Sequence, residues 1–219
     1  MTRLIVWRHG NTDWNAANRV QGQTDVPLNE LGRDQARAAA PLLASLRPDA
    51  IVSSDLSRAA ETADALAALT GLPVRADARL RERHFGQWQG LHLTEVAERF
   101  PDEYARWRAG DPAPGADLEP LHDLGERVAA ALLEAADAAP GGTVVIATHG
   151  GASRQGVGHL LGWDSGVLRG LGSLANCHWT ELRHAPRATA VGRAHEVQGW
   201  QLRGHNVGLI TAAAVVDAF

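Results

Sequence analysis

The stretch Leu4-Ile5-Val6-Trp7-Arg8-His9-Gly10 decides how the rest of the chain is interpreted. Its first four residues are apolar and partly β-branched, which is typical of a buried strand. Gly10 follows at once, so the backbone can turn sharply and approach a ligand closely. Arg8 and His9 are therefore presented at the carboxyl end of a strand, where open α/β sheets bind their ligands.

The residue types at this strand end suggest phosphate chemistry. The guanidinium of Arg8 is a planar fork of donors that suits phosphate oxygens. The neutral imidazole of His9 is a nucleophile near pH 7. A second apolar run at 144–148 ends in His149-Gly150-Gly151 and delivers another histidine to the same sheet edge. The two runs together indicate a histidine that accepts a phosphoryl group.

Composition excludes several other classes of protein. The chain has 219 residues, a net charge of −4 and a pI of about 6.2, which argues against nucleic acid or an anionic membrane as the main partner. It shows no hydrophobic signal segment and no apolar stretch long enough to span a bilayer. The single cysteine, Cys177, is expected to be a buried small side chain in a reducing compartment. We therefore expect a cytoplasmic protein.

All 21 side chains in the Lys and Arg count are arginines. This excludes lysine Schiff bases and the lysine-dependent phosphate-binding loop. A phosphate site must then be built from arginine, histidine, polar side chains and backbone N–H groups. The histidines other than His9 and His149 show no spacing typical of a zinc site, so we expect neither a metal nor a cofactor.

Strand and helix patterns alternate through most of the chain, which predicts an α/β fold with a largely parallel sheet. Strands are expected at 4–7, 49–53, 74–76, 144–148, 176–182 and 196–202, the last two antiparallel. Helices are expected at 29–46, 55–70, 121–138 and 150–161. The Trp-, Arg-, Gly- and Pro-rich stretch 79–120, with short helices at 93–100 and 103–108, is interpreted as an insertion over the sheet edge. We expect residues 1–219 to form one domain.

Four tryptophans and one further histidine can also be assigned a place in the fold. Trp7 and Trp14 are expected in the core, and Trp88 and Trp107 are expected to pack within the insertion, with contact to the substrate as the alternative. His84 lies beside the proposed proton donor described below, and we expect it at the mouth of the site.

Further residues along the chain suit phosphate. Arg58 lies at the start of a predicted helix, and a helix N-terminus is itself an anion site; the alternative is a solvated helix face. Thr12, Asn15 and Gln21 lie in the loop after the first strand and could donate hydrogen bonds to phosphate. Ordinary turn chemistry is the alternative for these three residues.

A leaving alkoxide needs a proton. Glu82 follows a short strand and precedes a glycine turn, and it is the best candidate for the donor. The alternative is a surface ion pair with Arg81 or Arg83. Spacing alone does not choose Glu82 over other acidic residues such as Glu30, Glu61 or Asp13.

The motif Arg8-His9-Gly10-Asn11-Thr12-Asp13-Trp14-Asn15 resembles the signature of the histidine phosphatase superfamily, in its phosphoglycerate mutase-like branch. The resemblance continues in order through most of the first 160 residues. It is carried by Gln21-Gly22, Asp25-Val26-Pro27-Leu28-Asn29, Ser53-Ser54-Asp55-Leu56-Ser57-Arg58-Ala59, Glu61-Thr62, Glu82 with Gly86, and His149-Gly150-Gly151. It implies three layers, with helices on both sides of a mostly parallel sheet, and a chemistry without metal.

The resemblance also implies roles for individual residues. His9 would be the phosphorylated nucleophile and Glu82 the proton donor. The phosphate pocket would be completed by Arg8, Arg58 and His149, assisted by Asn15, the Gln21-Gly22 backbone and Gly150. The partner would be a small phosphorylated metabolite, and the apolar late strands would also allow a homodimer.

Within this family the residues favour a phosphatase. Glu82-Arg83-His84-Phe85-Gly86 resembles the cofactor-dependent mutases, but Leu93 stands where those enzymes carry a lysine. Ala109 stands where they carry the second of two arginines. A mutase must hold a bisphosphate intermediate, which needs such extra cations. The run Gly86-Gln87-Trp88-Gln89-Gly90-Leu91 is closer to the phosphatases, in particular to the actinobacterial enzymes that act on glucosyl-3-phosphoglycerate. A phosphoglycerate mutase and a non-catalytic phosphate-binding protein are the two alternatives.

Overall fold

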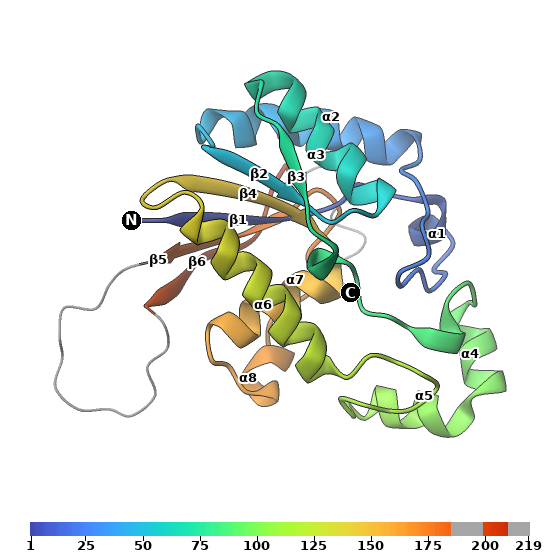
Figure 1. Cartoon of the computed structure of the whole chain (residues 1–219). Coiled ribbons are helices and arrows are strands. Elements are labelled where there is room, and N and C mark those ends of the chain that lie inside the picture. The colour runs from blue at the N-terminus through green and yellow to red at the C-terminus, as the bar shows by residue number, and fades with distance from the viewer. Residues whose placement is uncertain (185–198, 210–219) are drawn as a thin grey trace, which may run out of the picture.

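A six-stranded sheet runs through the middle of the molecule, with helices on both of its faces (Figure 1). The computed structural model describes residues 1–184 and 199–209. The sheet has the strand order β3-β2-β4-β1-β5-β6. Its members are β1 (Arg3–Arg8), β2 (Ala50–Ser53), β3 (Val74–Ala76), β4 (Thr143–Thr148), β5 (Trp179–His184) and β6 (Trp200–Val207). The first four strands are parallel, whereas β5 is antiparallel to β1 and β6 is antiparallel to β5. This confirms the predicted α/β fold.

One face of the sheet is covered by α2 (Glu30–Ser45) and α3 (Ser57–Thr70) (Figure 1). Helix α2 begins where the sequence predicts, because the Asn29 side chain accepts the Gly32 N–H at 2.9 Å. Successive strand residues point to opposite faces, so Ile5 and Trp7 of β1 pack under these helices.

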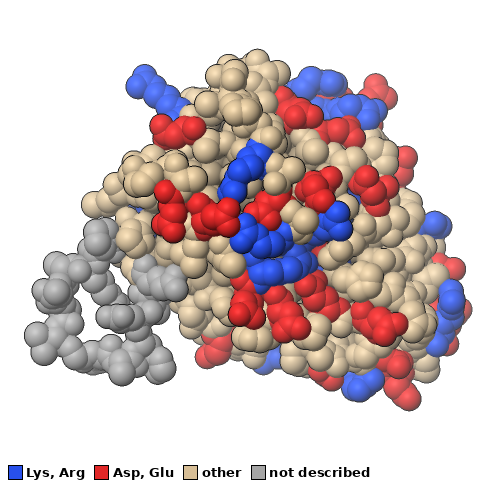
Figure 2. Space-filling model, viewed as in Figure 1, with Lys and Arg blue, Asp and Glu red and all other residues tan. Residues whose placement is uncertain are grey.

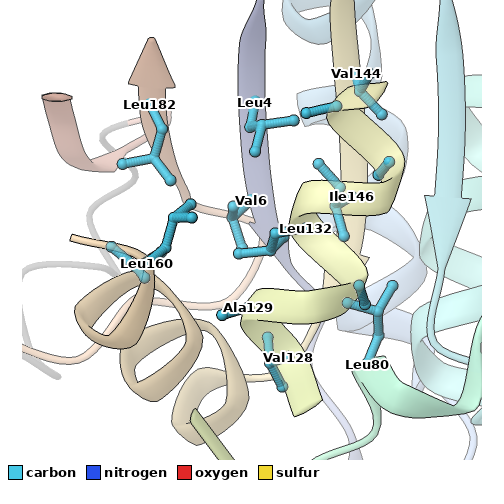
Figure 3. Close-up of a cluster of buried hydrophobic side chains, with 14 of the residues drawn as sticks. Leu4, Val6, Leu80, Val128, Ala129, Leu132, Val144, Ile146, Leu160 and Leu182 are labelled. Carbon is cyan, nitrogen blue, oxygen red and sulfur yellow. The ribbon is translucent and has the colours of Figure 1, made fainter. Parts of the chain in front are cut away.

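The opposite face packs against α6 (Leu121–Asp137) and α7 (Gly150–Leu160). Figure 3 shows Leu4 and Val6 of β1 meeting Leu132 of α6 in a fully buried cluster. Helix α7 begins immediately after β4, so the polar residues between them lie at the carboxyl edge of the sheet.

The insertion at 79–120 forms its own small cluster beyond that edge. It contains η2 (Gly86–Trp88), α4 (Leu93–Arg99) and α5 (Pro101–Arg108), and it follows η1 (Ala78–Leu80). Trp88 is fully buried against Tyr104 and Trp107. The expectation that Trp88 and Trp107 pack within the insertion is therefore confirmed.

Several boundaries differ from the sequence predictions. Helix α5 starts at Pro101 rather than at residue 103, because proline suits the first position of a helix. Strand β5 starts at residue 179 rather than 176, since Cys177 has a φ of 57°, which no strand residue adopts. Strand β6 covers 200–207, and residues 196–198 of the predicted strand lie outside the described part. Two short helices were missed, α1 (Asp13–Ala16) and α8 (Ser165–Arg169).

Trp14 was expected in the core, and this expectation is wrong. It lies half-buried in α1 with the Arg19 guanidinium 5.4 Å from its ring centroid. A helix of one turn carries no periodic pattern that would separate a core residue from a surface residue.

Charged side chains of both signs are interspersed on the face seen in Figure 2. Two ion pairs connect β3 and η1 to α6. Glu134 of α6 lies 2.7 Å from Arg75 of β3 and 2.6 Å from Arg79 of η1. Arg79 also lies 2.7 Å from Asp77. Among the described residues, no helix combines the length and the apolar character needed to cross a membrane.

Candidate active site

His9 and His149 meet at the carboxyl edge of the sheet. Strands β1 and β4 are parallel neighbours with Arg8 opposite Thr148, so the residues that follow them emerge side by side. The two imidazole rings lie 5.1 Å apart between centroids, at an angle of 61°. The prediction that two separate runs deliver histidines to one sheet edge is confirmed.

The ring of His9 is held as one tautomer. Its Nδ1 atom lies 2.6 Å from the carbonyl oxygen of Gly10, and because a carbonyl only accepts, Nδ1 carries the proton. Burial, followed by the nearby charges of Arg58 and Arg8, lowers the pKa of His9 well below its usual value. At neutral pH the ring is therefore uncharged, and the free lone pair lies on Nε2, the ring atom able to act as a nucleophile.

His149 is held as the opposite tautomer. Its Nδ1 atom accepts the Nε–H of Arg58 at 3.2 Å, so the proton lies on Nε2, 2.9 Å from the hydroxyl oxygen of Ser54. Burial and the charge of Arg58 lower the pKa of His149 well below its usual value. The residue is fully buried, and the edge of one ring meets the face of the other where it packs against His9.

Arg58 is a buried cation at the start of α3. Its other donors bind the carbonyl oxygens of Gly22 at 2.7 Å and Thr24 at 2.9 Å. Burial lowers the pKa of Arg58 to about 10, so it stays charged at neutral pH. No carboxylate of the described residues forms an ion pair with it. A buried charge is costly without a counterion, so the arrangement calls for an anionic ligand rather than a solvated helix face.

A pocket of about 340 Å³, here called the His9 pocket, lies in front of these groups. Its walls come from the β1 end, the loop after it, α3, the insertion and the start of α7. The residues that line it are Arg8, His9, Trp14, Asn15, Asn18, Arg19, Val20, Gln21, Gly22, Arg58, Glu82, Phe85, Leu93, Trp107, Gly150, Gly151 and Ser173. The predicted site residues are among them except Thr12 and the fully buried His149. His84 is exposed and does not line the pocket, contrary to expectation.

Thr12 does not face a ligand, because it caps α1. Its hydroxyl accepts the Asn15 N–H at 3.0 Å and lies 3.1 and 3.0 Å from the amide oxygens of Asn15 and Gln21. These contacts use the oxygen end of both amides. The NH₂ groups of Asn15 and Gln21 are thereby left to donate into the His9 pocket. Thr12 thus orients two donors instead of being one.

Glu82 is not paired with its arginine neighbours. Its Oε1 atom accepts N–H groups from Ala152 and Arg83, both at 2.8 Å, and its Oε2 atom accepts that of Gly151 at 3.0 Å. The carboxylate therefore occupies the N-terminus of α7, an electrostatically positive end. A Cβ atom on Gly151 would lie 2.6 Å from Oε1, so a larger residue there would displace the Glu82 carboxylate from its present position. Arg81 instead pairs with Asp55, its Nε 2.7 Å from Oδ1.

Sequence reasoning missed the residues that hold the Glu82 backbone. Arg127 of α6 donates to the carbonyl oxygens of Arg79 at 2.7 Å, Arg81 at 2.8 Å and Glu82 at 2.9 Å. It also pairs with Glu119 at 2.6 Å. No local signal marks Arg127, because it is one arginine on an amphipathic helix and its partners are about 45 residues away.

The insertion supplies the apolar side of the pocket. Leu93, Phe85 and Trp107 all line it, so the position where mutases carry a lysine holds an apolar side chain here. Ala109 is exposed and does not line the pocket. Arg19, stacked over Trp14, is a cation at this side that the sequence did not single out.

Within residues 1–184 and 199–209, no group of three or more His, Cys, Asp or Glu side chains is placed to hold a metal ion. The family model of the histidine phosphatase superfamily (branch 1) matches residues 4–196 of this chain.

The chain belongs to the histidine phosphatase superfamily.

Individual histidine phosphatases agree with the family model. A glucosyl-3-phosphoglycerate phosphatase from Mycolicibacterium vanbaalenii is 38% identical over 207 residues, covering 91% of this chain and 92% of the relative. The solved structure of a mycobacterial glucosyl-3-phosphoglycerate phosphatase with VO3 is 37% identical, with a TM-score of 0.82, and covers 94% and 99% of the two chains. A probable phosphoglycerate mutase from Photorhabdus laumondii is 33% identical over 193 residues, covering 85% and 87%. The chain is a phosphatase of the histidine phosphatase type.

Proposed function

We propose that this histidine phosphatase is a metal-independent phosphomonoesterase that hydrolyses a small phosphorylated metabolite through a phosphohistidine on His9. Glu82 is the proton donor. The observation that carries the proposal is the pairing of a neutral, single-tautomer imidazole with the buried, uncompensated cation Arg58. One supplies a nucleophile and the other requires an anion.

The first half-reaction transfers the phosphoryl group to the protein. The substrate phosphate lies against Arg8 and Arg58, with the amides of Asn15 and Gln21 and the Gly22 and Gly150 backbone around it. Such preorganised donors stabilise the charge that develops on the phosphoryl oxygens. The His9 Nε2 lone pair forms the N–P bond while the bond from phosphorus to the ester oxygen breaks. Protonated Glu82 gives its proton to that oxygen, which leaves as an alcohol.

The second half-reaction returns the enzyme to its starting state. The Glu82 carboxylate takes a proton from water as the water oxygen bonds to phosphorus. The N–P bond breaks, its electron pair returns to His9 Nε2, and inorganic phosphate leaves. We assign the mobile proton to Oε2, since Oε1 already accepts two N–H groups and Oε2 accepts one.

The substrate is proposed from the relatives and the pocket together. Relatives about 40% identical are named glucosyl-3-phosphoglycerate phosphatases, so this ester is the first compound to test. A cofactor-dependent mutase is the second candidate, favoured by the Glu82-Arg83-His84-Phe85-Gly86 run and by the 33% identical relative that is named a probable phosphoglycerate mutase. The apolar Leu93 in the His9 pocket argues against it. A retired, non-catalytic site is less well supported, because both histidines, Arg58 and Glu82 are present and engaged.

The experiment measures phosphate release and trapped phosphoenzyme side by side. Purified protein is treated with chelator and assayed with glucosyl-3-phosphoglycerate and p-nitrophenyl phosphate. We expect turnover of both esters, and acid-labile, base-stable label on the protein from ³²P-labelled substrate, which His9→Ala abolishes. Full labelling of His9→Ala would overturn the phosphohistidine assignment, and loss of activity with chelator that a divalent ion restores would overturn metal independence.

A further inference from the structure

A second pocket of about 560 Å³, here called the Arg154 pocket, adjoins the His9 pocket. The two share the lining residues Phe85, Trp107, Gly150, Gly151 and Ser173. Its volume suits a small molecule, as ligand sites span about 300–1,000 Å³. A phosphate group held at His9 would present the rest of its ester toward this space.

The lining of the Arg154 pocket is unbalanced in charge. Three arginines border it, Arg83, Arg154 and Arg169, and Asp111 is the one acid among its lining residues. Apolar walls come from side chains that include Trp107, Trp163, Leu121 and Leu124. A pocket with this lining suits a leaving group that combines an anionic group with a bulkier body.

Arg154 is the best placed of the three cations. It lies one turn after Gly150 and Gly151 on α7, so all three share a helix face. Its Nε and Nη2 atoms donate to the carbonyl oxygen of Leu168, at 3.2 and 2.7 Å, which fixes the guanidinium. No ion pair joins it to any carboxylate in the described part of the chain, and it is partly buried. Burial also lowers its pKa.

The other two arginines are less suited. Arg83 is buried, with only 3% of its surface exposed, and its guanidinium donates to the carbonyl oxygens of Glu119 at 2.7 Å and Pro112 at 3.1 Å, so it is less accessible to a ligand than the half-buried Arg154. Arg169 is exposed to solvent at the rim.

We propose that the Arg154 pocket binds the leaving group of the substrate and that Arg154 recognises a carboxylate on it. The inference rests on the proposed phosphatase reaction at His9. A phosphoglycerate ester fits the spacing, because its phosphorus and carboxyl carbon are four bonds apart, about 5 Å when extended. One helical turn, about 5.4 Å, separates the start of α7 from Arg154. A sugar attached beside the carboxylate would lie against the tryptophans of the pocket.

The test uses two esters that differ only in the carboxylate. In 3-phosphoglycerate the group is present, and in glycerol 3-phosphate a hydroxymethyl group replaces it. We expect wild-type kcat/KM to favour 3-phosphoglycerate, and Arg154→Gln to lower that preference by about 10- to 100-fold, as for a charged hydrogen bond. The loss should fall mainly on KM. Arg154→Lys should restore part of the preference because it keeps the charge.

Two matched variants and a third substrate make the outcome decisive. Arg37→Gln makes the same change on an exposed face far from the pockets, where Arg37 pairs with Asp34, and should alter nothing. Arg19→Gln removes the arginine of the His9 pocket that is not assigned to phosphate binding, as Arg8 and Arg58 are. Equal wild-type kcat/KM for the two esters, or loss of preference in Arg19→Gln but not in Arg154→Gln, would overturn the inference. No turnover of p-nitrophenyl phosphate by wild type would overturn the proposed function itself.

Discussion

The Nε2 atom of His149 lies 2.9 Å from the Oγ atom of Ser54, and both residues are fully buried. Because Arg58 occupies the other ring nitrogen, the imidazole of His149 is fixed at both ends. Ser54 therefore sets the orientation of a ring whose centroid lies 5.1 Å from that of the His9 ring.

Ser54→Ala should loosen this ring. The variant leaves the buried Nε2–H without an acceptor, which costs about 1–3 kcal/mol of folding free energy. We expect kcat/KM to fall roughly tenfold, equivalent to about 1.4 kcal/mol. Long-range ¹H–¹⁵N spectra of the ring nitrogens should show His149 protonated on Nε2 in the wild type and as a tautomer mixture in the variant.

Ser53→Ala is the matched control for Ser54. The Ser53 hydroxyl is also buried, but it donates to the Ser54 carbonyl at 2.8 Å and does not touch His149. It should cost stability without changing the ring spectrum. An unchanged His149 spectrum in Ser54→Ala would show that the hydroxyl does not orient the ring.

Glu82→Gln should separate substrates by leaving group. A proton donor contributes about 10²–10⁴-fold when the leaving group is a poor one. We therefore expect kcat on alkyl phosphates to fall by that factor, and kcat on p-nitrophenyl phosphate to fall far less. Steady-state kinetics on a series of esters checks this, and equal losses on all of them would remove Glu82 from the role.

Arg127→Lys should reproduce the Glu82 defect in weaker form. Lysine is a point donor and cannot bind three carbonyl oxygens and Glu119 together. We expect a roughly tenfold loss on alkyl phosphates, about 1.4 kcal/mol, that is not additive with Glu82→Gln in a double-mutant cycle. Arg75→Lys, which alters an exposed pair with Glu134, is the control. Additive losses would indicate that Arg127 acts independently of Glu82.

The buried histidines make stability depend on pH. The pKa values of His9 and His149 are lower in the folded protein than the value of about 6.5 in unfolded chains. Below pH 6.5 the unfolded state therefore binds more protons than the folded state. The contribution of the two neutral histidines to the free energy of unfolding is complete above pH 6.5 and is lost as pH falls toward their folded pKa values. In that window each histidine should make the free energy of unfolding rise by about 1.4 kcal/mol per pH unit.

Denaturant unfolding between about pH 5 and 8 measures this slope. His149→Asn should reduce this slope. An identical slope in wild type and His149→Asn would mean that burial does not keep His149 neutral.

The phosphoenzyme should react with water rather than with a second phosphoglycerate. Leu93 lines the His9 pocket and Ala109 stays outside it, so the cations a mutase uses to hold a bisphosphate are absent there. We expect phosphate release to exceed transfer between the 2- and 3-positions, and added bisphosphoglycerate not to stimulate turnover. Faster isomerisation that depends on bisphosphoglycerate would make this chain a mutase.

The sequence predicts the parts of the site that depend on sheet topology. His9 and His149 each end an apolar run, and parallel strands bring such ends together whatever the loops do. The start of α3 carries Arg58 to the same edge for the same reason. These positions follow from the pattern of apolar and polar residues within a single strand or helix, and that pattern can be identified in the sequence.

The rest depends on contacts between distant segments. Glu82 is chosen over other acids because its carboxylate reaches N–H groups of α7 that are 69 and 70 residues away. Arg127 is chosen in the same manner. Thr12 is the reverse case, a residue whose type suits phosphate binding but which has another role. Its hydroxyl accepts the Asn15 N–H in a helix cap. Residue type and spacing do not determine which hydrogen-bond partner each of these side chains contacts in the folded protein.

The turn after β1 is in backbone contact with the start of α2. A Cβ atom on Gly10 would lie 2.3 Å from the carbonyl oxygen of Gly32, and one on Gly32 would lie 2.0 Å from that of Asn11. The segment that aims His9 is thereby locked to the sheet-and-helix scaffold, whereas the insertion and α7 line the Arg154 pocket. In directed evolution, libraries restricted to residues that line the Arg154 pocket and not the His9 pocket should therefore change which esters are hydrolysed and leave nucleophile geometry intact. Any side chain at position 10 or 32 should instead eliminate the library member outright.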